Sequence, residues 1–384
     1  MADIEQPAAA GAVRWIDSDA ELQRACADWQ QRPVLALDTE FVRRTTFYPI
    51  PALLQCFDGV AVSVLDPLAI SDWQPLVTLL RDPSVCKVMH ACSEDLEVFW
   101  RLLGMLPEPL FDTQIAAGFC GMRPGMAYRK LVAELLQRDL PKDQTNSDWL
   151  VRPLAAEQLR YAADDVFYLF AVYQELIARA QQLGRVDWVL QESAVVGRAL
   201  PTLLAPESSY LRLKGAWRMT RRELAVARAL CAWREQQARL LDRPRNWIMK
   251  DAVVVELAQR QPTQLSALGD VDGLMAATVR KQGEQLLQLV QQARALPERE
   301  WPAALPNPNG PSLRAPLALL QRGVKACAKE LAIEPELILS RRQQDAVLAN
   351  WVNSGAPEAV LPDSCNSPWR AALLQATLRQ MERA

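Results

Sequence analysis

The sequence predicts an α/β domain followed by two small all-helical domains, and three observations support this fold class. In the first half of the chain, short apolar runs alternate with patterns of helical periodicity, as in domains whose helices cover a central sheet. The second half keeps the helical pattern and loses the strand-like runs. Six prolines between residues 297 and 316 interrupt that pattern, which indicates a connector. We therefore expect an α/β domain at 10–190, helical domains at 208–295 and 317–384, and a Pro-rich linker at 296–316.

Several strands are expected in the α/β domain. Val34-Leu35-Ala36-Leu37 is a short apolar run after Pro33, which is typical of a buried strand. The turn signal Asp58-Gly59 separates two further runs and predicts an antiparallel hairpin, and the sheet is expected to be mixed. Pro51 cannot donate to a sheet ladder, so the strand near it should start late or lie at an edge there. The expected strands are 34–37, 52–57, 60–65 and 87–91.

Capping residues mark where helices of this domain should begin. Ser93 is a good N-cap for a helix after the fourth expected strand, and Asp112 is a good N-cap for a helix near 113–120. A long helical pattern runs from 155 to 182 and ends before Gly184. In the second half, apolar residues at helical spacing predict helices at 217–241, 251–260 and 280–296.

Composition indicates a globular, cytoplasmic protein. Half of the residues are apolar and 23% are charged. No apolar run approaches the roughly 18–20 residues that cross a bilayer, and the start Met-Ala-Asp-Ile-Glu-Gln lacks the features of a secretory signal, so no membrane partner is expected. The eight cysteines form no Cys-x-x-Cys pair and His90 is the single histidine, which argues against zinc and redox sites. Any chemistry must therefore use mainly carboxylates, tyrosine, lysine or bound metal.

The net charge of −2 hides a basic segment in the second half. Residues 208–260 contain 12 Lys or Arg against 5 Asp or Glu, an excess of seven positive charges. Such a segment on a nearly neutral chain can contact the phosphates of a nucleic acid. A solvated helical face rich in arginine explains the same charges.

The first acidic motif is Asp38-Thr39-Glu40, at the end of the first apolar strand. In a strand, residues i and i+2 face the same side about 6.6 Å apart, at about 3.3 Å per residue. Two carboxylates on one face can bracket a metal ion. A pair of surface acids at a strand end is the alternative.

Two later segments supply further acids. Asp95 falls in the first turn of its helix, where the helix dipole favours a negative charge in any case. Tyr161 and Asp165 lie four residues apart and project from one face of the long helix. Tyr161 can equally be a core tyrosine, and His90 a hydrogen-bonded residue at a strand end. Asp165 on a packed face needs a compensating positive charge, which a metal ion supplies.

Together the acids predict a site for two divalent cations. Four carboxylates from a strand, a helix start and a later helix can hold two ions about 3.5–4 Å apart, one activating water and the other stabilising a leaving oxygen. Hard oxygen ligands suit Mg²⁺ or Mn²⁺. Crowded carboxylates resist simultaneous ionisation, so bound metal should stabilise the fold.

These motifs resemble, in their order and spacing, the DEDD exonuclease superfamily on an RNase H-like fold. The tyrosine four residues before the last aspartate is similar to the DEDDy branch, which includes the ribonuclease D family. The stretch near 210–293 resembles a helicase-and-RNase-D C-terminal (HRDC) domain, and 312–384 a diverged second copy. The stretches that carry the resemblance in the α/β domain are Ala36–Arg43, His90–Phe99, Phe111–Ala116, Ser147–Leu154 and Tyr161–Val166.

The resemblance implies a set of site residues. Asp38, Glu40, Asp95 and Asp165 match the metal ligands, and Tyr161 matches the residue that orients the attacking water. Glu40 counts as catalytic as well as a ligand. Thr39, Phe41 and His90 lie beside the motifs and are expected near the terminal nucleotide.

The resemblance also implies a function. It is 3′→5′ hydrolysis of RNA with release of 5′-mononucleotides, mainly on precursor tRNA and other structured RNAs with 3′ tails. The basic helical domain would hold the RNA body. Separately, the sequence suggests no extended apolar face left over, so we expect a monomer. The alternatives are an exonuclease acting on DNA and a non-catalytic RNA-binding scaffold on the same fold.

Overall fold

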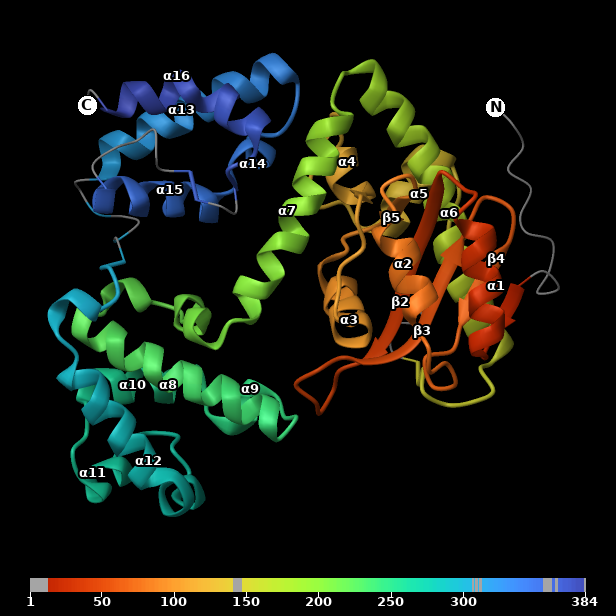
Figure 1. Cartoon of the computed structure of the whole chain (residues 1–384). Helices are drawn as coiled ribbons and strands as arrows, with labels where there is room; N and C mark the ends of the chain where they lie inside the picture. Colours follow the sequence, from red (N-terminus) through yellow and green to blue (C-terminus); the bar gives the residue numbers. More distant parts are fainter. Residues whose placement is uncertain are drawn as a thin grey trace.

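The computed structural model describes residues 13–140, 147–305, 307, 310, 313–354, 361–362 and 365–382. It contains a six-stranded sheet with helices on both faces, followed by two groups of helices (Figure 1). The expected class, a mixed α/β domain followed by helical modules, is confirmed. The expected start at residue 10 and parts of the expected linker and last domain lie outside the described residues. No helix within the described ranges is long and apolar enough to span a bilayer.

The sheet has the strand order β1-β4-β3-β2-β5-β6. Strands β2, β3 and β4 form an antiparallel meander, whereas β1 pairs with β4, β5 with β2 and β6 with β5 in parallel. The central position of β2 matters because it carries two of the candidate metal ligands. The strands are β1 (Val13–Ile16), β2 (Val34–Val42), β3 (Ile50–Phe57), β4 (Val62–Leu65), β5 (Cys86–Met89) and β6 (Leu110–Asp112).

Pro51 is accommodated by a β-bulge. Glu40 pairs with Leu53 and Phe41 with Pro51, so Ala52 is an extra residue on β3. The carbonyl of Ala52 accepts a hydrogen bond from Arg152 at 2.8 Å. Strand β3 begins at Ile50, so the expectation of a late start was wrong. The expectation that Pro51 lies at an edge is confirmed for one side of β3. Strand β4 pairs with residues 54–57 of β3, so Pro51 has no partner strand on the side away from β2.

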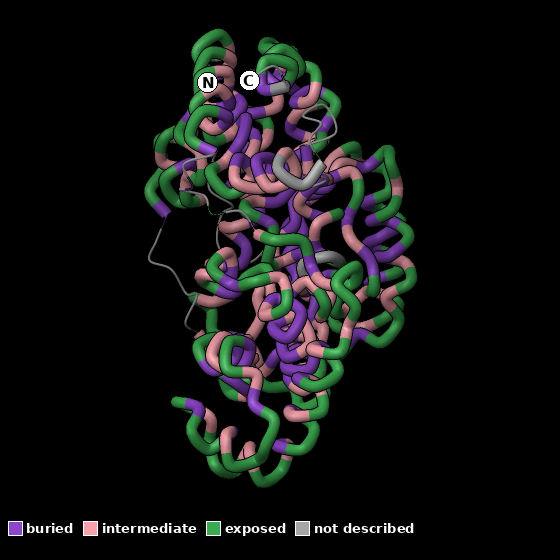
Figure 2. Tube along the Cα trace, turned by 90° about the vertical axis from the view of Figure 1, so that its left-hand side faces the viewer, coloured by how far each residue is buried: buried purple, intermediate pink, exposed green. Residues whose placement is uncertain are grey.

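The two faces of the sheet bury different helices. Residues alternate in direction along a strand, so Ala36 faces α6 (Ala156–Gln182) while Leu35 and Leu37 face the opposite layer. That opposite layer consists of α1 (Asp19–Trp29), α2 (Gln74–Arg81) and α3 (Ser93–Leu103). Figure 2 shows buried residues mainly in the interior of the molecule and exposed residues mainly on its outside.

Helix starts are only partly as expected. Asp112 caps α4 (Thr113–Phe119) by accepting hydrogen bonds from the backbone of Gln114 and Ile115, as predicted. Ser93 is not an N-cap: it is the first residue of α3, and the N-cap is Cys92. The same Asp112 carboxylate accepts the Cys92 N–H at 3.0 Å and so holds the backbone that leads into α3. α5 (Tyr128–Leu136) and α7 (Val186–Leu204) complete the domain, and α7 packs against β6.

The first helical module has its own hydrophobic core. The expected helices 217–241, 251–260 and 280–296 correspond to α8 (Arg221–Leu240), α10 (Asp251–Arg260) and α12 (Ala276–Ala295). A Thr220–Glu223 capping box starts α8. The module comprises η1 (Pro206–Arg212), η2 (Ala216–Arg218), α8 (Arg221–Leu240), α9 (Arg245–Ile248), α10 (Asp251–Arg260), α11 (Leu265–Gly269) and α12 (Ala276–Ala295), and η3 (Glu298–Glu300) follows it.

The second helical module packs against the α/β domain and shares its core. Trp369 stacks on Trp188 of α7 with ring centroids 4.9 Å apart. The guanidinium of Arg370, 1% exposed, forms an ion pair with Glu192 of α7 at 2.6 Å. Figure 1 shows this module against α4 and α7, on the far side of α7 from the sheet. The module comprises α13 (Arg314–Leu331), α14 (Pro335–Ile338), α15 (Arg341–Ser354) and α16 (Pro368–Glu382).

Candidate metal centre

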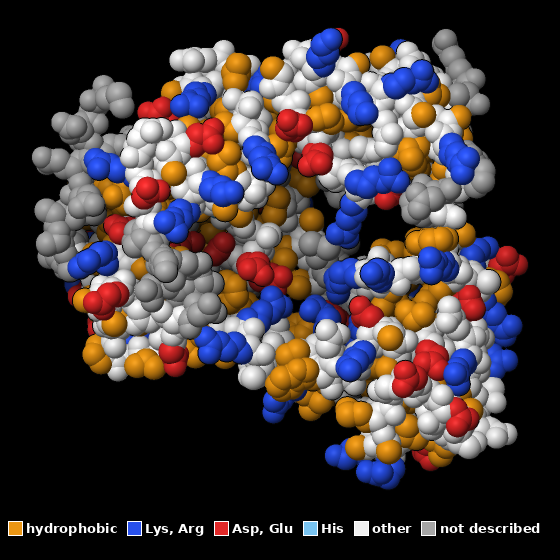
Figure 3. Space-filling view, turned by 180° about the vertical axis from the view of Figure 1, so that it is seen from behind, with side chains coloured by type: hydrophobic (Ala, Val, Ile, Leu, Met, Phe, Trp, Pro, Cys, Tyr) orange, Lys and Arg blue, Asp and Glu red, His pale blue; other side chains and the backbone are white. Residues whose placement is uncertain are grey.

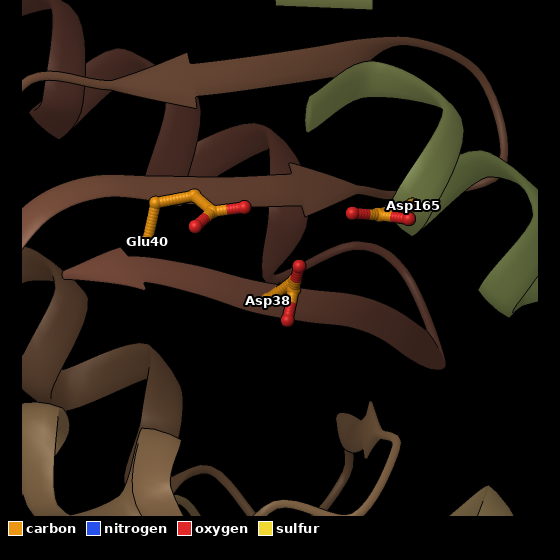
Figure 4. Close-up of side chains that lie close together, drawn as sticks. All are labelled: Asp38, Glu40 and Asp165. Carbon is orange, nitrogen blue, oxygen red and sulfur yellow. The ribbon is translucent and has the colours of Figure 1, made fainter. Parts of the chain in front are cut away.

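Three of the predicted acids converge between β2 and α6. Asp38 and Glu40 are two residues apart on β2 and share the face that α6 covers. Asp165 comes from α6, and Figure 4 shows it on the helix beside the strand, with Asp38 and Glu40 nearby. Ligand oxygens of Asp38, Glu40 and Asp165 all lie within 4.8 Å of one another. The strand and the helix thus bring together residues more than 120 positions apart in the sequence.

The close approach of α6 depends on small residues. Ala162 and Ala163 are buried at the contact with the sheet, whereas Tyr161 and Asp165 are half-buried. Tyr161 lies one turn before Asp165, and its ring centroid is 6.1 Å from that of the buried Trp149. Tyr161 and Asp165 border one cavity of about 220 Å³, together with Tyr128 and Leu140.

Asp95 reaches the site from the other side of the sheet. Thr39 lies between the two ligands on β2, so its side chain points to the opposite face, toward α3. Its hydroxyl donates to Asp95 at 2.5 Å. Among the described residues, the ligand oxygens that lie within 4.8 Å of one another belong to Asp38, Glu40 and Asp165, and Asp95 is not part of this group. The negative charge of Asp95 nevertheless acts on Asp38.

Burial and mutual repulsion make the carboxylates hard to ionise without a cation. Burial raises the pKa of Asp38 well above its usual range, and the charges of Asp95, Asp165 and Glu40 raise it further. Burial also raises the pKa of Asp95 to about 7, although the Thr39 hydroxyl favours its charged form. A divalent cation would relieve both effects. The donor set, carboxylate oxygens only, fits Mg²⁺ or Mn²⁺.

His90 occupies a structural position at the end of β5. Its Nδ1 lies 3.0 Å from the Thr113 hydroxyl, and its ring packs 5.3 Å from that of Tyr128. Burial lowers the pKa of His90. His90 is therefore a hydrogen-bonded residue directly after a strand, and its expected contact with the terminal nucleotide stays a prediction. Phe41, in contrast, is half-buried at the bulge opposite Pro51.

Two residues beside the acids were not anticipated from the sequence. The Tyr128 hydroxyl donates to the backbone carbonyl of Asp165 at 2.5 Å and so fixes the turn of α6 that carries this acid. Gln55 pairs across the sheet with Asp38, and directly opposite residues face the same side. Gln55 is fully buried, and neither polar atom of its amide has a hydrogen-bond partner. Gln55 lies beside the site because of the register between β2 and β3, which cannot be predicted from the sequence.

Family comparisons assign both halves of the chain. The family model described as 3′-5′ exonuclease matches residues 13–180, and the HRDC domain model matches residues 223–290. The chain is 45% identical over 372 residues to the ribonuclease D of Pseudomonas paraeruginosa, covering 97% of this chain and 98% of that protein. It is 36% identical over 367 residues to the ribonuclease D of Escherichia coli, covering 95% of this chain and 97% of that protein.

The fold agrees with these relatives. The crystal structure of Escherichia coli RNase D, described as an exoribonuclease involved in structured RNA processing, matches with a TM-score of 0.86 at 34% identity. The match covers 97% of this chain and 98% of that one. It confirms the architecture expected from the motifs, an exonuclease domain followed by HRDC-type helices. The chain therefore belongs to the ribonuclease D family of 3′→5′ exoribonucleases.

Proposed function

We propose that the chain shortens RNA from its 3′ end through two divalent ions, Mg²⁺ or Mn²⁺, held by Asp38, Glu40, Asp95 and Asp165, and releases 5′-mononucleotides. The observation that carries this proposal is the group of three carboxylates from β2 and α6 within 4.8 Å. The raised pKa of Asp38 supports it, because burial and like charges there favour a bound cation. When bound, such ions activate water and stabilise the leaving oxygen of an in-line displacement.

The neighbouring side chains have separate roles in this proposal. Tyr161 orients the attacking water, since it lies one turn before Asp165 and borders the same cavity. Glu40 takes part in catalysis as well as in metal binding. Thr39 holds Asp95 through its hydroxyl. A further contact of Thr39 with the terminal nucleotide would compete with that hydrogen bond, so Phe41 is the better candidate for this contact.

The proposed substrates are precursor tRNAs and other structured RNAs with 3′ tails. The basic segment 208–260, an excess of seven positive charges, supports a role of the first helical module in holding the RNA body. We propose domain limits of 10–190, 208–295 and 317–384, with a linker at 296–316. Helix α7 (Val186–Leu204) runs across residue 190 and packs on β6, so most of it belongs physically to the exonuclease domain. We also propose that the protein acts as a monomer.

One incubation tests this function. Purified protein is mixed with a 3′-extended tRNA or with single-stranded DNA of matched sequence, with Mg²⁺ or with EDTA, and the products are identified by mass spectrometry. We expect 5′-mononucleotides from the tRNA tail in Mg²⁺ alone. Faster cleavage of the DNA would favour a DNA exonuclease, and RNA binding without any product in Mg²⁺ or Mn²⁺ would favour a non-catalytic scaffold.

A further inference from the structure

A cleft lies between the exonuclease domain and the first helical module. Its volume is about 550 Å³, and both parts of the chain contribute to its walls. The exonuclease domain supplies the residues that follow β2, and the module supplies residues from η1, α8 and the start of α9. We call it the arginine cleft after the residues that dominate its lining: Arg43, Arg44, Arg212, Arg234 and Arg245.

The two walls are held together by specific contacts. The Asp242 carboxylate, just after α8, accepts the backbone N–H groups of Phe47 and Tyr48 at 2.9 and 3.1 Å. The guanidinium groups of Arg245 and Arg239 lie over the Phe47 ring, 4.5 and 5.3 Å from its centroid. These contacts cross nearly 200 positions of sequence. The cleft is therefore a preformed part of the fold.

The walls carry more positive than negative charge. Glu97 pairs with Arg43 at 2.8 Å, and Asp251 pairs with Arg234 at 2.6 Å. Arg245 pairs at 2.5 Å with Glu235, which is fully buried behind the cleft. Glu235 also lies 4.0 Å from Arg212, and the lining itself contains five arginines and two acids. The three ion pairs fix the planes of the guanidinium groups of Arg43, Arg234 and Arg245, which lowers the entropy that is lost when an anion binds. Figure 3 shows Lys and Arg side chains gathered where the two parts of the molecule meet.

Two residues of the cleft lining lie close in the sequence to candidate metal ligands. Arg43 follows Glu40 by three residues, which is about 10 Å at about 3.3 Å per residue. Glu97 follows Asp95 by two residues on α3. An RNA strand whose 3′ end lies at the carboxylates would therefore reach the cleft within a few nucleotides.

We propose that the arginine cleft binds the phosphates of the single-stranded RNA segment immediately upstream of the 3′ end. This inference rests on the proposed function, because it takes the carboxylates as the place where the 3′ end lies. Guanidinium groups match phosphate oxygens in geometry and charge, and contacts to phosphates carry no sequence preference. The cleft would thus fix the register of any 3′ tail, whatever its bases.

The test compares two cleft variants with a matched control in the full-length protein. Arg44→Gln and the double variant Arg44→Gln/Arg212→Gln remove charge from the two walls. Arg280→Gln removes one charge from an exposed position on α12, outside the cleft lining. Binding is measured in EDTA at several salt concentrations, with an RNA dinucleotide and with a single-stranded RNA of about 20 nucleotides. Hydrolysis of both RNAs is then measured in Mg²⁺.

We expect the double variant to bind the long RNA about tenfold more weakly, with a salt dependence reduced by about 0.7 for each lost phosphate contact. Its kcat/KM should fall about tenfold more on the long RNA than on the dinucleotide. Long-RNA affinity and salt dependence equal to those of Arg280→Gln would overturn the proposal. An equal loss on both substrates would overturn it too, because the arginines would then act on the metal centre.

Failure of the cleft and failure of the proposed function give different results. If the wild-type protein degrades RNA and the cleft variants behave like the control, the cleft alone is refuted. If the wild-type protein releases no nucleotide from either RNA in Mg²⁺ or Mn²⁺, the proposed function is refuted. Binding in EDTA still reports on the cleft in that case, since it requires no catalysis.

Discussion

Asp38→Asn should stabilise the metal-free protein while abolishing its activity. The substitution keeps the shape of the side chain and removes its charge. Oxygens of Glu40 and Asp165 lie within 4.8 Å of Asp38, and at an effective dielectric constant of about 20 each such pair of charges repels by about 3.5 kcal/mol. Burial first, and then the charges of Asp95, Asp165 and Glu40, raise the pKa of Asp38 in the metal-free protein, which favours its protonated form.

The sign of the pH dependence follows from that raised pKa. Folded protein binds the proton more tightly than unfolded protein, so the free energy of unfolding falls as the pH rises from the usual value of 3.8 toward the folded pKa. The loss is about 1.4 kcal/mol per pH unit over this window. An asparagine does not titrate. At pH 8 in EDTA we therefore expect Asp38→Asn to be more stable than wild type by about 2–4 kcal/mol, and near pH 4 the two should be similar.

Urea denaturation at pH 4 and pH 8, in EDTA and in Mg²⁺, measures these differences. Mg²⁺ should stabilise the wild-type protein, because only the folded state presents the full carboxylate set, and should do so much less for the variant. A variant that is less stable than wild type in EDTA at pH 8 would refute the reasoning. So would a difference between the two proteins that does not change with pH.

Three further predictions concern residues around the site. Tyr161→Phe should lower kcat on RNA with little change in the RNA dissociation constant measured in EDTA, and a weaker affinity instead would make the ring a binding residue. Gln55→Leu should raise the free energy of unfolding of metal-free protein by about 1–2 kcal/mol in urea titrations, because it removes a buried amide that has no partner; lower stability would contradict this account. Arg370→Met should lower the free energy of unfolding by about 3 kcal/mol, since it leaves Glu192 without its ion pair, and unchanged stability would mean that the second helical module does not brace α7.

Local patterns in the sequence predicted which faces of the strand and the helix carry the candidate ligands, and their role as metal ligands stays a prediction. Asp38 and Glu40 share a strand face and Tyr161 and Asp165 share a helix face, and both facts follow from the periods of 2 and 3.6 residues. That these faces meet depends on long-range packing, here on the alanines of α6 against β2. The distance between Asp95 and the other acids could not be predicted from local patterns. Its hydrogen bond with Thr39 comes from the opposite side of the sheet.

The features that were missed depend on contacts distant in the sequence. Strands β1 and β6 are only four and three residues long, and their pairing partners define them better than their own residues do. The N-cap of α3 is Cys92 and not Ser93, and the contact of Asp112 with the backbone of Cys92 joins residues 20 positions apart. The partnerless amide of Gln55 and the contacts of Asp242 with the loop after β2 are likewise products of the assembled fold.

The most direct test of the account is anomalous scattering from crystals soaked in Mn²⁺. The carboxylates of Asp38, Glu40, Asp95 and Asp165 should hold two Mn²⁺ ions about 3.5–4 Å apart. Crystals of Asp38→Asn should show weaker peaks or none. Strong Mn²⁺ peaks elsewhere in the wild-type protein, with the space between β2 and α6 empty, would contradict the claim that these acids form the metal centre.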